Sequence, residues 1–346
     1  MDADDRPAAS PCCAPRTAPV GTEPSSAVTS NADRPGLDTI EAAPTDTSGQ
    51  VLVPGGTFTM GDAFGEGYSA DGEQPAHRVT VAAFFLDPVA VTNERFAAFV
   101  EATGWVTDAE HIGVSAVFHL AFDGDPSHVR HRVGATPWWL AVDGADWRHP
   151  EGPHSSIDHR GDHPAVHVSW FDAHAFCRWA GTTLPTEAQW EYAARGGLAG
   201  RRFPWGDELT NDGEWRCNIF QGHFPTDNTG DDGHLTTAPV DAFTPNGYGL
   251  HQLAGNVWEW CADWFSPFTY RDRAAGPVTD PGGPAIGSSR VMRGGSYLCH
   301  DSYCHRYRVA ARSSTTPDSA TANIGFRCAN PALATSERRN EYQPLG

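Results

Sequence analysis

Residues 92–104 carry the clearest helical pattern of the chain. Phe96, Phe99 and Val100 recur at the spacing of one helix face, Thr92 precedes them and Gly104 follows. Threonine is a good N-cap, and glycine commonly ends a helix because it adopts the left-handed conformation easily. The pattern predicts a helix between Thr92 and Gly104 with one buried face.

Two capping boxes predict two further helices. In a capping box the N-cap side chain bonds the backbone of the third helical residue, whose own side chain bonds back. The pairs are Ser169 with Asp172, before residues 170–180, and Thr186 with Gln189, before residues 187–195. Glu187 and Glu191 share one face of the second helix. We interpret them as structural or solvated side chains, not as a catalytic dyad.

Alternating apolar positions predict short strands. Residues 51–61 alternate on either side of Pro54-Gly55-Gly56, which predicts two strands around a turn. Residues 78–86 predict one more strand. Residues 105–165 show no clear period and are rich in tryptophan and histidine, so we expect either an irregular functional surface or a loop held by buried tryptophans.

The two ends of the chain differ in composition from the rest. Residues 1–48 are rich in Ala, Pro, Ser, Thr and Asp without a periodic apolar pattern, so we expect a disordered leader. Cys12 and Cys13 lie in it and are interpreted as incidental. One domain is predicted over residues 49–332, followed by a tail at 333–346.

Composition narrows the class of protein and its partners. The 346 residues are 39% hydrophobic and include 36 glycines and 27 prolines, which indicates a loop-rich globular domain with a sizeable core. A formal charge of −19 argues against nucleic acid as a partner. No apolar stretch is long enough for a membrane span, and the first residues lack the features of a signal peptide. We therefore expect a cytoplasmic protein with reduced thiols.

Two thiols near the carboxyl end are the strongest candidates for chemistry. Cys299 and Cys304 lie five positions apart, behind Gly294-Gly295 and Ser296. An offset of five places side chains on opposite faces of a strand and well apart around a helix. If both thiols serve one site, the backbone between them must bend as an irregular loop.

The spacing of the two thiols leaves three interpretations open. They could form a structural disulfide, or they could bind zinc together with His300 and His305. They could also form a reactive or metal-binding pair, since soft thiolates select copper(I) among the available metals.

An oxygen-rich stretch indicates either a calcium site or a solvated acidic loop. Calcium takes six to eight oxygen ligands, including backbone carbonyls from glycine-rich loops. The residues are Asn218, Asp227, Asn228, Asp231 and Asp232, with glycines at 222, 230 and 233.

Residue content adds a family resemblance. The run Arg-Gly-Gly-Ser-Tyr-Leu-Cys-His-Asp-Ser-Tyr-Cys-His-Arg-Tyr-Arg at 293–308 resembles the formylglycine-generating enzymes of the sulfatase-modifying factor family, as do Leu-Pro-Thr-Glu at 184–187, Thr-Pro-Asp-Ser at 316–319 and Asn-Ile-Gly-Phe-Arg-Cys at 323–328. The resemblance covers most of residues 50–330. It is specific because the Cys-x4-Cys pair distinguishes the enzymes from non-oxidase members of the fold. It implies a C-type-lectin-like α+β domain.

The resemblance also implies an activity. Family members use O2 and a thiol reductant to oxidise a cysteine in an unfolded sulfatase segment, Cys-x-Pro-x-Arg, to Cα-formylglycine. Copper(I) would be held by Cys299 and Cys304 and joined by the substrate thiol, and loss of hydrogen from Cβ would give a thioaldehyde that water hydrolyses. Ser296 matches a residue near the reacting oxygen, Asn323 one that lines the peptide site, and Tyr303 is expected to orient the thiols and contact the peptide.

Structural calcium and a cysteine pair are further implications of the resemblance. The first calcium site would use Asn218, the Ile219 carbonyl, Asp232 and the His234 carbonyl. The second would use the Gly255 and Val257 carbonyls and Glu259, although Gln252 departs there from the asparagine of the vertebrate-type pattern. Cys177 and Cys328 match a disulfide of secreted members, and in a reducing compartment they would be two buried thiols in contact.

Two rival functions remain at this stage. One is a metal-free oxidoreductase in which Cys299 and Cys304 cycle between dithiol and disulfide. The other is a non-catalytic binding module of the same fold.

Overall fold

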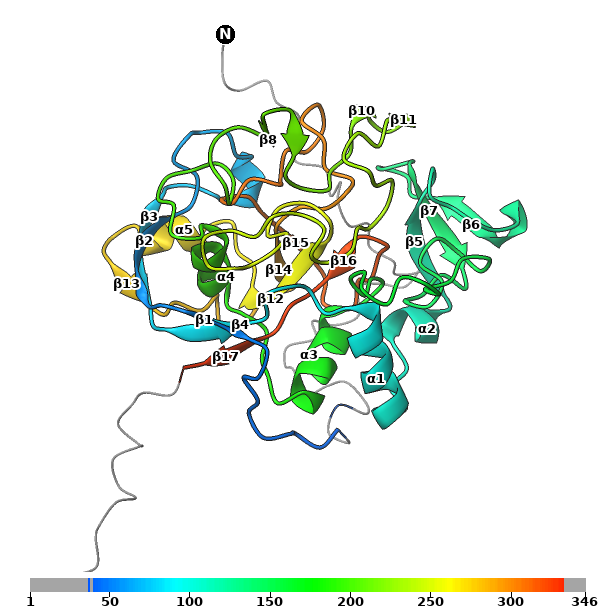
Figure 1. The fold of residues 1–346 in the computed structure, drawn as a ribbon, viewed down its shortest axis with the longest axis horizontal. Helices are drawn as coiled ribbons and strands as arrows, with labels where there is room; N and C mark the ends of the chain where they lie inside the picture. The colour runs from blue at the N-terminus through cyan, green and yellow to red at the C-terminus, as the bar shows by residue number, and fades with distance from the viewer. Residues whose placement is uncertain (1–36, 38–39, 333–346) are drawn as a thin grey trace, which may run out of the picture.

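A four-stranded sheet occupies the middle of the molecule in the computed structural model, which describes residue 37 and residues 40–332. Its strand order is β15-β14-β12-β16, with β14 antiparallel to both β12 and β15, and β16 parallel to β12 (Figure 1). Helix α4 packs on β12 and β14, and helix α1 packs on α3. The five helices in the described part of the chain are α1 (Asn93–Thr103), α2 (Asp108–Ile112), α3 (Trp170–Trp179), α4 (Glu187–Ala194) and α5 (Thr269–Arg273).

Smaller sheets surround the central one. Three of them have three strands, in the orders β1-β4-β17, β13-β3-β2 and β5-β7-β6, and two are short hairpins, β8-β9 and β10-β11. The strands are β1 (Val51–Val53), β2 (Gly56–Met60), β3 (His77–Val81), β4 (Phe84–Leu86), β5 (Val114–Phe118), β6 (Val129–Arg132), β7 (Trp139–Asp143), β8 (Thr210–Asn211), β9 (Glu214–Trp215), β10 (Gly222–His223), β11 (Asp227–Asn228), β12 (Trp258–Trp264), β13 (Val278–Thr279), β14 (Arg290–Arg293), β15 (Arg312–Thr315), β16 (Ile324–Gly325) and β17 (Ala329–Pro331).

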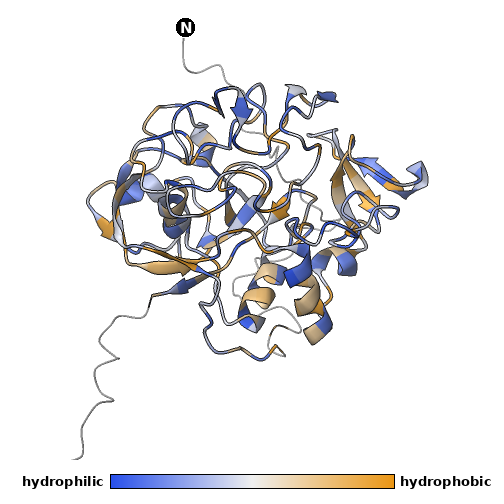
Figure 2. Cartoon of the chain, in the orientation of Figure 1, coloured by the Kyte–Doolittle hydropathy of each residue, from blue (hydrophilic) through white to orange (hydrophobic). Residues whose placement is uncertain are grey.

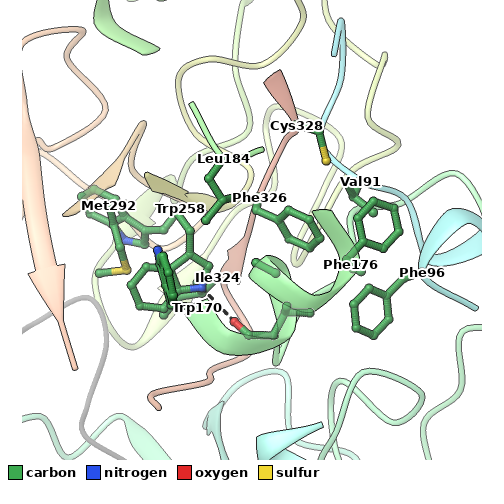
Figure 3. Close-up of a cluster of buried hydrophobic side chains, with 14 of the residues drawn as sticks. Val91, Phe96, Trp170, Phe176, Leu184, Trp258, Met292, Ile324, Phe326 and Cys328 are labelled. Atoms are coloured by element: carbon green, nitrogen blue, oxygen red, sulfur yellow. Dashed lines mark hydrogen bonds between the residues drawn. The ribbon is translucent and has the colours of Figure 1, made fainter. Parts of the chain in front are cut away.

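The three helices predicted from their caps are present. The Thr92 side chain accepts a hydrogen bond from the backbone N–H of Arg95, and Gly104 ends α1 with a φ of 67°. Both capping boxes are formed, at the start of α3 and at the start of α4. The main core lies where α1 and α3 meet the central sheet, with Phe96, Phe176 and Phe326 in ring contact (Figure 3).

The prediction of one strand at residues 78–86 is wrong, because β3 and β4 are separate strands in different sheets. β1 pairs with β4, and β2 pairs with β3, so the chain changes sheet at two places. The two crossings touch: a Cβ atom on Gly55 would lie 2.8 Å from the Ala83 nitrogen. Glycine is therefore required at this point, and the two predicted strands at 51–61 do not pair with each other.

The expectation of an irregular segment at 105–165 is also partly wrong. The segment contains α2 and the β5-β7-β6 sheet, in which polar residues of β6 form the outer edge (Figure 2). All five residues of β5 are buried, so this strand lacks the alternation that identifies a strand in sequence. Trp139 and Trp147 are buried, as the alternative of a tryptophan-held segment required.

Packed chain begins before residue 49. Leu37 and Ile40 are buried in the main core, the Ile40 carbonyl accepts from Arg178, and the Asp46 carbonyl accepts from Asn330. The remainder of the predicted leader, with Cys12 and Cys13, and the tail at 333–346 lie outside the described residues.

The loop-rich α+β class is confirmed. No helix in the described part of the chain is both long enough and apolar enough to cross a bilayer.

Four buried charges join α4 to the central sheet. Arg293 of β14 bonds Glu187 at 2.9 Å and Glu191 at 2.6 Å, and Arg312 of β15 bonds Glu187 at 2.7 Å. All four side chains are at most 2% exposed, so the structural interpretation of the two glutamates is correct and the solvated one is wrong. Burial by itself would raise the pKa of Glu187, but Arg312 and Arg293 hold that pKa below its usual value.

Glu187→Gln should lower the free energy of unfolding by about 3–5 kcal/mol, because it leaves two buried guanidinium groups without their shared countercharge. Chemical denaturation at neutral pH measures this loss. Glu101→Gln on the exposed face of α1 is the matched control and should change stability by less than about 0.5 kcal/mol. Equal stabilities of the two variants would contradict the proposed role of the ion pairs.

Candidate active site

A pair of glycines sends the chain from β14 into the thiol loop. Gly294 and Gly295 directly follow the buried Arg293 and have φ angles of 94° and 73°. A Cβ atom on Gly295 would lie 2.9 Å from the Arg306 carbonyl oxygen. The glycines therefore allow both a left-handed turn and close approach to the segment that follows the second thiol.

The loop brings the two thiols into contact. The sulfur atoms of Cys299 and Cys304 are 3.5 Å apart, and each residue is 1% exposed. Between them the His300 carbonyl accepts hydrogen bonds from the N–H groups of Tyr303 and Cys304, at 3.1 and 2.7 Å. The predicted bend is thus present. A separation of 3.5 Å is well above the ~2.05 Å of a disulfide, so the cysteines are thiols in this structure.

The two neighbouring histidines have partners other than the thiols. His300 Nδ1 bonds the Ser302 hydroxyl at 2.8 Å, and His305 Nε2 bonds the Glu66 carbonyl at 2.9 Å. Within residues 37 and 40–332 no group of three or more His, Cys, Asp or Glu side chains is placed to hold a metal ion. The arrangement therefore does not support a four-ligand zinc site, whereas a two-sulfur site remains compatible with it.

Ser296 and Asn323 lie on one side of the thiol pair. The Ser296 N–H donates to the Cys299 sulfur at 3.4 Å, and its hydroxyl accepts from the Asn323 side-chain amide at 2.9 Å. Asn323 is fixed in turn by the Thr321 hydroxyl, which donates to its side-chain oxygen at 2.6 Å. The structure thus joins three of the predicted site residues, Cys299, Ser296 and Asn323, in one hydrogen-bonded chain.

Half-buried aromatic rings surround Tyr303, the residue before Cys304. The ring of Tyr303 stacks on Phe224 with centroids 4.9 Å apart and meets Trp138 edge-on at 4.8 Å. Phe224 and Trp138 are themselves in contact. We call Trp138, Phe224 and Tyr303 the aromatic wall. Phe224 was missed by sequence reasoning, because it lies in a short hairpin without periodicity.

An acidic loop clamps the chain that leaves Cys304. Arg306 bonds Asp71 at 2.6 Å, and Arg308 bonds Glu73 at 2.9 Å. The Tyr68 hydroxyl donates to the Tyr303 carbonyl at 3.3 Å. Tyr68, Asp71 and Glu73 were also missed, since 235 positions separate each of them from its partner and no local pattern links the two segments.

The residues of the first predicted calcium group are neighbours in the structure. Asp232 accepts from the N–H groups of Ile219 and His234, at 3.0 and 2.9 Å, so all three residues lie together with Asn218. The Asn218 amide donates to the Thr236 carbonyl, and its oxygen is buried without a hydrogen-bond partner. Burial raises the pKa of Asp232. A buried oxygen without a donor, beside a carboxylate destabilised by burial, fits a hard cation.

In the second predicted calcium group, the carboxylate is already occupied by protein donors. Both oxygens of Glu259 accept from Arg327 at 2.7 Å, and one of them also accepts from the Trp190 indole at 2.7 Å. The carboxylate therefore already has a cationic partner, although the Gln252 side-chain oxygen nearby in sequence is buried without a hydrogen-bond partner. A cation bound by Glu259 with the Gly255 and Val257 carbonyls stays a prediction.

The other four cysteines in the described part of the chain are buried. The sulfurs of Cys177 and Cys328 are 3.7 Å apart, which is contact between two thiols. Cys217 and Cys261 are 0% exposed.

Comparison with known proteins places this architecture in a family. The model of the sulfatase-modifying factor enzyme 1-like domain matches residues 37–332. A formylglycine-generating enzyme of Streptomyces coelicolor is 64% identical over 85% of this chain and 93% of its own length. An inactive Cα-formylglycine-generating enzyme 2 of Bos taurus is 42% identical over 83% of this chain and 89% of its own length.

Solved structures support the fold. PvdO from Pseudomonas aeruginosa superposes with a TM-score of 0.58 at 24% identity, over 82% of this chain and 94% of that protein. At that identity the likeness concerns architecture alone. Because a single family model spans nearly all of the described residues and a close relative matches over most of its length, the chain belongs to the sulfatase-modifying factor enzyme 1-like family.

Proposed function

We propose that this protein converts a cysteine of a sulfatase segment to Cα-formylglycine. Family membership alone does not carry the proposal, because the family includes a relative described as inactive. The observation that carries it is the 3.5 Å contact between the Cys299 and Cys304 sulfurs, on a loop bonded to Ser296 and Asn323. The name of the 64% identical relative supports the same activity.

Copper(I) is the metal that suits this pair. Two thiolate sulfurs select a soft monovalent ion, and a two-sulfur site leaves room for a third sulfur from the substrate. When bound by Cys299 and Cys304, copper would supply the means of reacting O2 with the substrate cysteine, which side chains alone do not provide.

The proposed reaction balances when a thiol reductant supplies two of the four electrons that O2 takes up. The cysteine side chain of the substrate, O2 and two molecules of a thiol R–SH give the aldehyde, hydrogen sulfide, water and the disulfide R–S–S–R. The Cβ–S bond and one Cβ–H bond break and a C=O bond forms. Four electrons reduce O2, two from the substrate carbon and two from the thiol reductant.

The residues of this chain would hold and orient the reactants. The Ser296 N–H bond to the Cys299 sulfur stabilises negative charge on that thiol. The Ser296 hydroxyl, kept in position by Asn323, would orient the reacting oxygen. Because both cysteines are 1% exposed, water is largely excluded from the sulfurs.

The aromatic wall suits the expected peptide. Half-buried aromatic rings offer flat apolar surface next to Cys304, and the proline of a Cys-x-Pro-x-Arg segment is apolar and rigid. A substrate that is still unfolded can present such a segment in extended form.

Reduced thiols at 177, 299, 304 and 328 are compatible with a reducing compartment, and we place the protein in the cytoplasm.

A second candidate function, metal-free thiol oxidoreduction, is supported by the same contact between the Cys299 and Cys304 sulfurs. Two thiols 3.5 Å apart could also cycle between dithiol and disulfide without any metal. The two candidates differ in their product: a thiol oxidoreductase gives a disulfide on the peptide, whereas the proposed enzyme gives an aldehyde and releases sulfur.

Cys299→Ser and Cys304→Ser should each lower turnover of a Cys-x-Pro-x-Arg peptide at least about 100-fold, because each removes one of two soft ligands. Mass spectrometry of the peptide, with and without added copper(I), measures the conversion. The Cys12→Ser/Cys13→Ser double variant is the control, because it also replaces cysteine by serine but outside the proposed site. It should retain full activity. Aldehyde formation that persists in either single variant, or that is independent of copper in metal-stripped protein, would disprove the metal role.

Calcium should stabilise the protein through the first oxygen group. At about 100 times its dissociation constant a ligand adds about 2.7 kcal/mol, which is roughly 5 °C in Tm for a domain of this size. Thermal unfolding in calcium chloride and in EGTA measures the difference. Asn218→Ala should abolish the calcium-dependent shift, whereas Asp231→Asn, an exposed neighbour of Asp232, should keep it. A full shift in Asn218→Ala would refute this assignment.

A further inference from the structure

The segment 218–234 connects the predicted calcium group to the thiol loop through the backbone. The Phe220 N–H, directly after the Ile219 carbonyl of that group, donates to the Cys299 carbonyl at 3.1 Å. The Asn218 carbonyl accepts from Asn256, whose own carbonyl accepts from Tyr297 at 2.9 Å. The first two members of the calcium group are therefore one or two hydrogen bonds away from the loop that carries the thiols.

The same segment carries the aromatic wall residue Phe224 on the β10-β11 hairpin. This hairpin projects at the edge of the molecule near the β5-β7-β6 sheet (Figure 1). Gly222, His223 and Asp227 are exposed, whereas the Phe224 ring packs among other rings. The ring contacts of Phe224 are to Phe118, Trp138, Phe220 and Tyr303.

Gln221 fixes the base of the hairpin and also touches the calcium group. Its N–H donates to the Asn228 side chain at 3.2 Å, and its carbonyl accepts from the Thr229 N–H at 3.2 Å. Its side-chain amide donates to Asp232 at 2.8 Å and to the Ile219 carbonyl. Two of the oxygen-bearing groups expected to bind calcium thus contact the residue that anchors the hairpin.

Binding of a cation to this oxygen group would therefore change the hydrogen bonds of Gln221. An ion bound to Asp232 and the Ile219 carbonyl would compete with the Gln221 amide N–H for the same oxygens. The amide would have to reorient, and the hairpin whose backbone Gln221 holds would adjust with it. A further polar contact of the hairpin is made by the Pro225 carbonyl, which bonds His119 at 2.9 Å.

We infer that Phe224 is a specificity-determining residue of the peptide site and that Gln221 is a positioning residue that links its placement to calcium. The inference rests on the proposed function, because it concerns how that substrate is bound. Calcium would tighten peptide binding by fixing the 218–234 segment that carries the hairpin. The sulfurs of Cys299 and Cys304 are not members of the predicted calcium group, so they would stay able to bind copper(I).

The test measures binding of a fluorescent peptide in which the substrate cysteine is serine, so that no reaction occurs. Phe224→Ala should raise Kd about tenfold, since loss of one aromatic contact of about 1.4 kcal/mol corresponds to that factor. Phe224→Tyr should restore binding to within about threefold. His223→Ala, on the exposed side of the same hairpin, is the matched control and should bind like the wild type.

The link to calcium is tested by repeating the titrations in EGTA. Wild type should lose affinity several-fold without calcium, and both Phe224→Ala and Gln221→Ala should respond much less. With the cysteine peptide, Phe224→Ala should raise KM far more than it lowers kcat. Copper(I) binding to the thiols, followed by competition with a chromophoric chelator, should stay within twofold of wild type in both variants and so report that the site is folded.

Limited proteolysis gives a readout independent of any variant. Cleavage within residues 222–228 of the wild type should be several times slower in calcium chloride than in EGTA. Equal cleavage rates, or a Phe224→Ala variant with unchanged Kd or with full sensitivity to EGTA, would overturn the inference. Failure of the proposed function is distinct, because the wild type would then leave the cysteine peptide unconverted in the presence of copper.

Discussion

Buried pairing of arginine with carboxylate fixes the chain on both sides of the two thiols. Before the loop, Arg293 is held by Glu187 and Glu191 of α4. After it, Arg306 and Arg308 are held by the 62–75 loop. Such pairs contribute little net stability, since desolvation offsets their attraction, but any other arrangement would leave a buried charge without a partner. Their main effect is to permit a single placement of the segment between them.

Fixed ends make a strongly bent loop feasible. Between Arg293 and Arg306 the chain turns through Gly294-Gly295 and returns, so that two sulfurs five residues apart come within 3.5 Å. Two thiols already held in contact would lower the entropic cost of the copper(I) binding that we propose. The ion pairs thus position the thiols, while the Ser296 N–H donates to the Cys299 sulfur and Asn323 holds the Ser296 hydroxyl.

Local patterns in the sequence were sufficient for part of this arrangement. Capping boxes predicted α3 and α4, and the offset of five between the thiols predicted the bend. The clamp by Asp71 and Glu73 could not be predicted, because a pairing across more than 230 residues leaves no trace in local spacing. β5 was missed for a related reason, since a fully buried strand does not alternate. The resemblance predicted the calcium group, which stays a prediction, and only the structure shows that its residues contact the base of the hairpin.

The two thiols are supported in physically different ways. The chain after Cys304 is held by ion pairs that are at most 9% exposed, which added salt screens weakly. Cys299 is held by neutral hydrogen bonds from Ser296 and Phe220, and the latter belongs to the segment that carries the predicted calcium ligands. A disturbance of that segment would therefore act directly on Cys299 and on Phe224 of the aromatic wall, while Arg306 and Arg308 keep their carboxylate partners.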